Sequence, residues 1–182
     1  MPPQQRADAR RNYERLLAVA VEAVAEHGAS ASREQIGRTA GVGSGTVRRH
    51  FPTRHALLDA VFHDQVEGLA ARAADLADAP DPRAALLDWL GALTTYAATF
   101  KGLAEALVQQ TGSPDTYCST GRLTAAGAPL VQRAGPWLAP GVTIEGLIDL
   151  ITGIALVAER YGDPPAHAAR MWDLTVRGIS PA

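Results

Sequence analysis

Two adjacent arginines lie near the end of the short polar stretch from Ser44 to His50. A guanidinium group can donate two parallel hydrogen bonds to guanine, and a short helix fits the major groove of duplex DNA. Val47 and Phe51 are four residues apart, so on a helix they share one face and leave the polar residues on the other. The stretch therefore predicts a DNA-recognition helix, whose outward face carries Ser44, Gly45, Thr46, Arg48, Arg49 and His50.

A second short helix must precede this one and pack across it. Ser32 followed three residues later by Gln35 is typical of the cap that begins such a helix. Gly37 offers a small residue where the two helices cross, and Gly41 tolerates the positive φ of a tight turn. We expect the helix-turn-helix unit to be held from beneath by Ile36, Val42, Val47 and Phe51.

The remaining elements follow from caps and breaks. We expect Ser44 to cap the third helix and Thr53 to cap a long fourth helix that ends near residue 77, before Pro80. The first helix is expected to begin at about residue 10 and to end at residue 27, and no alternation of β-branched residues favours a strand. The sequence predicts an all-α fold of about nine helices, the later ones over 83–100, 102–111, 119–138, 143–161 and 164–178.

Residues 10–63 resemble the DNA-binding domain of the tetracycline-repressor (TetR) family. The resemblance is carried by Ile36, Ala40–Gly41–Val42, Gly45–Thr46–Val47, His50–Phe51–Pro52 and Thr53–Arg54–His55–Ala56–Leu57–Leu58. It implies an N-terminal arm and three-helix helix-turn-helix domain over 1–53, continued into a fourth helix over 54–78. A helical ligand-binding and dimerisation domain is then implied over 79–182. The family usually has Tyr where this chain has Arg48, which predicts a different operator, richer in guanine.

By position, the resemblance implies that Ser32 meets a phosphate group and that His50 and Arg54 contact the DNA backbone. Arg10 and Arg11 are expected to precede the first helix, where they would touch phosphates or the minor groove, although solubility alone explains them equally well. The implied function is a sequence-specific transcriptional regulator, most simply a repressor. A small-molecule effector would release it from a pseudo-palindromic operator.

The charge of the chain is distributed unevenly. Residues 1–63 hold nine arginines and six acidic residues, whereas residues 64–182 hold eight basic and thirteen acidic residues. A basic N-terminal part and an acidic C-terminal part are expected when only the N-terminal part approaches phosphate groups. With 47% hydrophobic and 20% charged residues, the composition is that of a folded globular protein and excludes a disordered chain.

The cellular setting follows from what the chain lacks. Cys118 is the single cysteine, so no intrachain disulfide can form and a reducing compartment is expected. The N-terminus has no apolar signal-peptide core, and the most apolar stretch, 142–158, contains Glu145 and Asp149. We expect a cytoplasmic protein, associated with the nucleoid when bound to DNA, with no membrane partner, cofactor or metal.

The helix expected over 143–161 is apolar on nearly every side, so it must be covered on every side. One face can meet its own core and another a second copy of the chain. The resembling family pairs this helix and the next with their copies, which implies a homodimer. A buried core helix in a monomer is the alternative. The expected interface comprises Leu147, Leu150, Ile151, Ile154, Val157, Met171, Trp172 and Thr175.

A set of aromatic and aliphatic residues could line a pocket between the helices of the C-terminal domain. The set is Trp89, Leu93, Tyr96, Phe100, Leu107, Tyr117 and Trp137. Tyrosines combine an apolar ring with a polar tip, which suits a ligand with some polar groups. The resemblance implies an apolar or aromatic effector. Simple packing without a ligand explains each of these residues equally well.

Two other classes of protein are weaker explanations. His55, Asp59, His63 and Glu67 form a stripe of potential zinc or nickel ligands at a spacing of four. Successive members lie about 6 Å apart along a helix, so all four cannot share one ion, and a solvated polar face is the simpler interpretation. No phosphate-binding glycine loop, HExxH, CxxC or nucleophile elbow favours an enzyme. A structural DNA-binding protein would not need so long an acidic C-terminal part.

Overall fold

The structure is a computed structural model that describes residues 3–28, 31–100 and 114–178, with backbone alone for 3–8, 55 and 114–119. Within those ranges the chain forms eight α-helices and one short 3-10 helix and no strand, which confirms the all-α prediction. The helix expected over 102–111 lies outside the described residues. Two compact units are present, Met1–Asp64 and Gln65–Ala182. None of the described helices combines the length and apolar character that crossing a membrane requires.

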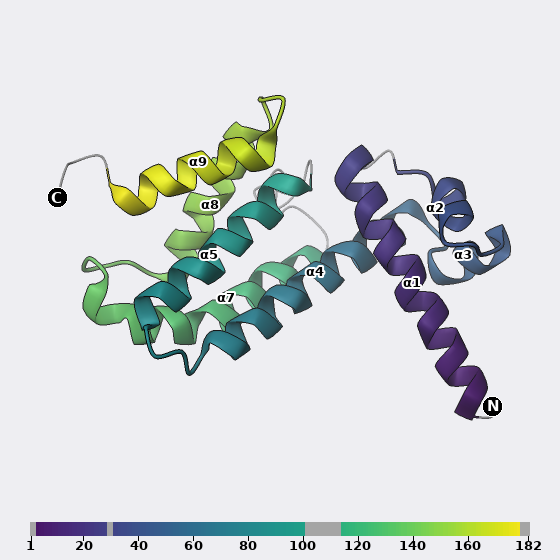
Figure 1. The fold of residues 1–182 in the computed structure, drawn as a ribbon, viewed down its shortest axis with the longest axis horizontal. Coiled ribbons are helices and arrows are strands. Elements are labelled where there is room, and N and C mark those ends of the chain that lie inside the picture. The colour runs from purple at the N-terminus through teal and green to yellow at the C-terminus, as the bar shows by residue number, and fades with distance from the viewer. Residues whose placement is uncertain (1–2, 29–30, 101–113, 179–182) are drawn as a thin grey trace. The chain divides into compact units, whose positions relative to one another are not determined.

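The first unit contains α1 (Pro3–His27), α2 (Arg33–Thr39), α3 (Ser44–His50) and the beginning of α4 (Arg54–Leu76) (Figure 1). Helix α1 packs against α2, and α2 packs against α3. The buried core of this unit is formed by Leu16, Leu17, Ala20, Val24, Ile36, Ala40, Val47, Phe51, Leu57 and Val61. Ile36, Val47 and Phe51, which were expected to hold the helix-turn-helix unit, therefore share one core with the apolar residues of α1.

Helix α1 begins earlier than predicted. Pro3 occupies its first position, where the missing N–H group costs nothing. No glycine or further proline interrupts the chain until Gly28, which closes the helix with a φ of +56°. Arg10 and Arg11 therefore lie within α1 and not on an arm before it, so that part of the prediction is wrong.

The predicted helix caps agree with the structure at two of three positions. The Ser32 hydroxyl accepts a hydrogen bond from the Gln35 amide at 3.4 Å, and the Thr53 hydroxyl accepts one from the Ala56 amide at 3.0 Å. The expected cap at Ser44 is wrong. Gly43 takes the extended cap conformation, with no side-chain cap, and Ser44 is already the first helical residue.

The second unit is built around α5 (Pro82–Thr99). It packs against α7 (Pro114–Ala134), α8 (Ile144–Ala158) and α9 (Pro164–Arg177), and the four helices form one bundle in Figure 1. A 3-10 helix, Gly135–Trp137, follows α7. The buried residues of α5 are Ala85, Leu86, Trp89, Leu90, Leu93, Thr94, Tyr96, Ala97 and Ala98. They lie on much of its circumference, as a central helix requires.

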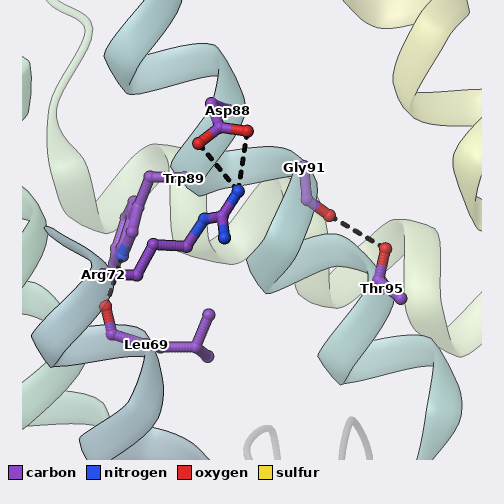
Figure 2. A network of polar contacts seen from close by, with 6 residues as sticks. All are labelled: Leu69, Arg72, Asp88, Trp89, Gly91 and Thr95. Carbon is purple, nitrogen blue, oxygen red and sulfur yellow. Dashed lines mark hydrogen bonds and ion pairs between the residues drawn. The ribbon is translucent and has the colours of Figure 1, made fainter. Parts of the chain in front are cut away.

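The later part of α4 is held against α5 by a buried and an exposed contact (Figure 2). Trp89 is fully buried, and its Nε1 donates to the Leu69 carbonyl oxygen at 2.9 Å. Beside it, Arg72 Nη2 donates to both carboxylate oxygens of Asp88 at 2.8 Å. Exposed ion pairs contribute about 0–1 kcal/mol, so burial of the indole is the larger contribution to stability.

Two further arginines connect α4 to α7. Arg122 forms a bidentate ion pair with Glu67, with nitrogen–oxygen distances of 2.8 and 2.9 Å. Arg133 donates to the backbone carbonyls of Ala77 and Ala79, which lie just after α4 ends. These contacts fix the C-terminal part of α4 within the second unit.

Candidate nucleic-acid interface

The third helix is anchored from beneath as the sequence predicts. Val47 is 2% exposed and Phe51 is 1% exposed. Gly41 has a φ of +66°, the left-handed conformation that the turn between α2 and α3 needs. The Val42 amide donates to the Gly37 carbonyl oxygen at 2.9 Å, which ties the turn to α2. The start of α3 is therefore fixed by both backbone and side-chain contacts.

The opposite face of α3 is open to solvent. Arg48 and Arg49 are both exposed, as are Ser44 and Gly45, whereas Thr46 and His50 are half-buried. Arginine, serine and threonine are donors suited to base edges and phosphates. The arrangement can therefore present a compact basic surface to the major groove.

An aromatic contact from α1 supports the end of α3. The Tyr13 ring lies 5.3 Å from the His50 ring and 6.1 Å from the Phe51 ring, measured between centroids. Because the contact joins residues far apart in the sequence, helical spacing gave no sign of it. It holds the half-buried imidazole of His50 in place on the surface of the unit.

Arg33 is a second residue that the sequence analysis missed. It is the first residue of α2, and its Nη1 donates to the carbonyl oxygens of Phe51 at 3.0 Å and Pro52 at 2.6 Å. Backbone carbonyls have no sequence signature, so the partners of this guanidinium could not be predicted.

The other predicted phosphate contacts lie on α1, at the cap of α2 and at the start of α4, in the same unit. Ser32 is exposed although its hydroxyl caps α2, and Arg54 is exposed at the first position of α4. Arg10 forms an ion pair with Glu14 at 2.7 Å, and this hydrogen bond and charge raise the pKa of the Arg10 guanidinium. The Glu14 carboxylate therefore competes with any phosphate for Arg10.

The predicted pocket residues are only partly brought together. Trp89, Leu93, Tyr96 and Phe100 are all buried along α5 and at its end, and the rings of Tyr96 and Phe100 lie 5.4 Å apart. The indole of Trp89 binds the backbone of α4, which is a packing role. Leu107 and the side chain of Tyr117 lie outside the described residues.

Trp137 does not belong with this set. Its side chain is 56% exposed and borders a shallow surface depression with Pro80, Asp81, Pro82 and Arg83. The aromatic character of Trp137, on which the prediction rested, does not show which way the side chain faces. The 3-10 helix after α7 turns it to the surface instead.

Tyr96 carries the polar group that best suits a ligand. Its hydroxyl oxygen is buried and has no hydrogen-bond partner in the described structure. Burial raises the pKa of this phenol, because the charged form would lose its hydration. An unsatisfied buried hydroxyl costs about 1–3 kcal/mol, so a ligand that bonded it would recover that free energy.

Several predicted interface residues are buried inside the second unit. Ile151 is 1% exposed and Ile154 is 7% exposed, the latter in a cluster with Ala98, Ala158 and Ala168. Met171 and Trp172 pack against the same cluster. Ile151 and Ile154 therefore form core contacts and cannot be surface contacts, which corrects the prediction at these two positions.

Other apolar residues on α8 and α9 do reach the surface. Leu150 is 41% exposed and Val157 is 46% exposed, and both belong to the expected interface. Leu147 is half-buried and Thr175 is exposed. Leu174 on α9 and Tyr161, between α8 and α9, lie outside the predicted set and are each 50% exposed. Large exposed apolar residues gathered on neighbouring helices are typical of a protein interface.

No group of three His, Cys, Asp or Glu side chains suitable for a metal occurs among the described residues. Within the polar stripe of α4, Glu67 is ion-paired with Arg122, and the side chain of His55 is not described.

Two family models match the chain. Residues 16–61 match the model of the bacterial regulatory proteins of the tetR family, and residues 81–181 match the SbtR-like C-terminal domain of transcriptional regulators. The chain belongs to the TetR family. Regulators of this family bind DNA operators, act as dimers and bind small-molecule ligands. The protein is therefore a DNA-binding transcriptional regulator.

Solved structures agree with this assignment. A TetR transcriptional regulator from Streptomyces coelicolor is 32% identical, covers 93% of this chain and 98% of its own, and has a TM-score of 0.71. A TetR regulator from Mycobacterium vanbaalenii is also 32% identical, covers 86% and 96%, and has a TM-score of 0.66. FadR from Bacillus subtilis, solved in complex with stearoyl-CoA, shares the fold at 18% identity over 92% of this chain and 100% of its own, with a TM-score of 0.62. No curated protein matches the sequence.

Proposed function

We propose that the protein is a homodimeric repressor that binds a pseudo-palindromic operator and leaves it when a small-molecule effector binds. The observation that carries this proposal is the exposure of Arg48 and Arg49 on a helix whose opposite face is anchored by Val47 and Phe51. A regulator of chromosomal operators works in the cytoplasm and is associated with the nucleoid while bound.

Within the DNA site, the residues divide by the chemistry that they offer. Arg48 is assigned to base recognition, because its guanidinium is exposed and can pair bidentately with guanine. Gly45 lets the backbone of α3 approach the groove. The remaining assigned contacts, to phosphates or bases, are Arg10, Arg11, Ser32, Ser44, Thr46, Arg49, His50 and Arg54.

A two-fold dimer would provide the second recognition helix. The exposed apolar residues Leu150 and Val157 on α8 and Leu174 on α9 form the contact surface that we assign to the partner. Two-fold symmetry repeats the same contacts on both subunits and places the recognition helices about 34 Å apart, one turn of DNA. That geometry predicts an operator with two related half-sites.

The effector is assigned to the second unit, beside the buried ring of Tyr96. A mainly apolar molecule with one hydrogen-bonding group fits the apolar residues of α5 together with the unpartnered Tyr96 hydroxyl. Helix α4 continues from the first unit into the second, so it is the element that we expect to transmit the signal. Any effector can shift DNA binding only by the difference in its affinity for the two states.

The experiment that tests the proposal selects an operator from random duplex DNA with the purified protein and follows binding by gel shift across salt concentrations. A regulator should select a defined sequence and lose affinity steeply as salt rises, because phosphate contacts release counterions. Arg48→Ala should relax the preference at one base pair and cost about 1–3 kcal/mol. An equal loss on all sequences would make Arg48 a phosphate contact, and no binding at low salt would refute the proposal.

A further inference from the structure

The C-terminal end of α3 needs a contact from outside the helix. Helix α3 has only seven residues and stops at His50, with Phe51 as its C-cap. Pro52 has no N–H group, so it cannot extend the hydrogen-bonding pattern. Carbonyl groups at a helix end have no partners within the helix. Apolar burial of Val47 and Phe51 resists separation of the helix, but such contacts are not directional.

Arg33 supplies a directional contact at this end. One guanidinium nitrogen, Nη1, donates to two successive carbonyl oxygens, those of Phe51 at 3.0 Å and Pro52 at 2.6 Å. These acceptors lie 18 and 19 residues further along the chain. A positive group at the C-terminus of a helix also complements the partial negative charge there. Charge-assisted hydrogen bonds are stronger than neutral ones, so this contact fixes the position of the chain after α3.

We propose that Arg33 is a positioning residue for DNA recognition, which sets the orientation of α3 without touching DNA. The turn before α3 is tied to α2 by the Val42–Gly37 hydrogen bond, and the segment after α3 is tied to α2 by Arg33. With both ends tied to one helix, the direction in which Arg48 faces is fixed before DNA arrives. The inference rests on the proposed role of α3 in DNA recognition.

The test compares Arg33→Ala with the wild-type protein on two duplexes of equal length, the sequence that the wild type selects and a random sequence. Misoriented recognition side chains lose base contacts, so affinity for the selected duplex should fall about tenfold or more. Affinity for the random duplex should change much less, because phosphate contacts tolerate a tilted helix. The slope of log affinity against log salt should stay the same.

Arg38→Ala is the matched control. Arg38 lies on the same helix and is exposed, and its Nη2 donates to Gln35 Oε1 at 3.0 Å within α2. Its loss removes the same charge and should leave the ratio of selected to random affinity at the wild-type value. Helix content and thermal unfolding of each variant show whether it folds. If Arg33→Ala does not fold, Arg33→Lys takes its place, because Lys keeps the charge but not the planar geometry. For that variant we expect a ratio of selected to random affinity between that of the wild type and that expected for Arg33→Ala.

Three results would overturn the proposal. First, folded Arg33→Ala, or the Arg33→Lys variant that replaces it, could show the same ratio of selected to random affinity as the wild-type protein. That result would show that the contact does not orient α3. A salt slope lower by about 0.9 would show that Arg33 neutralises a phosphate itself. An equal loss of the ratio in Arg38→Ala would assign the effect to net charge. Failure of the proposed function is distinct, because the wild-type protein would then select no duplex.

Discussion

Gly37 on α2 and Val47 on α3 meet where the two helices cross. A Cβ atom on Gly37 would lie 2.8 Å from Val47 Cγ2 and 3.4 Å from the Val42 carbonyl oxygen. Val47 is 2% exposed and β-branched, so its methyl group cannot rotate away freely. Gly37→Ala is therefore expected to lower the free energy of unfolding by about 1–3 kcal/mol, measured by urea denaturation. An unchanged unfolding midpoint would show that α2 and α3 move apart to accept the methyl group without a loss of free energy of unfolding.

Gly45 offers the matched substitution with the opposite sign. A Cβ atom there would meet nothing within 4 Å, and the residue is exposed. Alanine is more favourable than glycine in a helix by up to about 1 kcal/mol, so Gly45→Ala should stabilise the protein slightly. If α3 approaches the groove closely, the same methyl group should weaken operator binding. A variant that is more stable in urea and weaker in gel shift is the expected result, and undiminished binding would remove Gly45 from the DNA site.

The first unit was predictable because its signals are local. Ser32 and Thr53 cap helices that begin at the next residue. Gly41 identifies a turn because the positive φ needed there favours glycine at that single position. The failure at Ser44 has the same local character, since Gly43 and Ser44 compete for one cap position. Sequence patterns specify such features well because their physical cause spans one turn of helix.

The contacts that sequence could not supply connect distant segments. Arg33 binds backbone carbonyls, which every residue has, and Tyr13 on α1 packs on His50 at the end of α3. On α8, Ile154 and Val157 are equally apolar, yet one is buried in the unit and the other is exposed. Apolar periodicity identifies a face that must be covered, but it does not say whether the same chain or a second copy covers it.

Tyr96→Phe tests the buried hydroxyl in the second unit. Removing a polar atom that has no partner in the described structure should raise the free energy of unfolding by about 1 kcal/mol in the absence of effector. The same change should weaken the effector-dependent release of DNA, because the ligand loses its hydrogen bond. Thermal unfolding and gel shift with candidate effectors measure the two effects. A destabilised variant would show that the hydroxyl is satisfied in the folded protein.

The pH dependence of stability provides a second measure of Tyr96. Burial raises its pKa in the folded state, whereas a tyrosine in the unfolded chain titrates near pH 10. The free energy of unfolding is therefore unaffected by titration of this phenol below about pH 10. It falls as the pH rises further, because there the unfolded state releases the proton more readily than the folded state. Relative to Tyr96→Phe, the wild-type protein should lose stability above pH 10.

The exposed apolar residues of α8 and α9 predict how the dimer can be broken. Leu150 and Val157 are seven residues apart, so they lie on one face of α8, and both are more than 40% exposed. Leu150→Asp would place a carboxylate in each half of a two-fold interface. An unpaired buried charge costs several kcal/mol, so the dissociation constant of the dimer should rise by about 100-fold or more. Light scattering after gel filtration measures the change in mass.

The control for this charge is Ala169→Asp, an exposed position on α9 on the side of that helix away from Leu174. It should remain dimeric and bind the operator as the wild-type protein does. Because each half-site alone is contacted by one recognition helix, monomeric Leu150→Asp should bind the selected duplex only weakly, while its helix content stays the same. A Leu150→Asp variant that remained dimeric would move the interface to another face of the unit. A monomer with full operator affinity would contradict the two-fold arrangement itself.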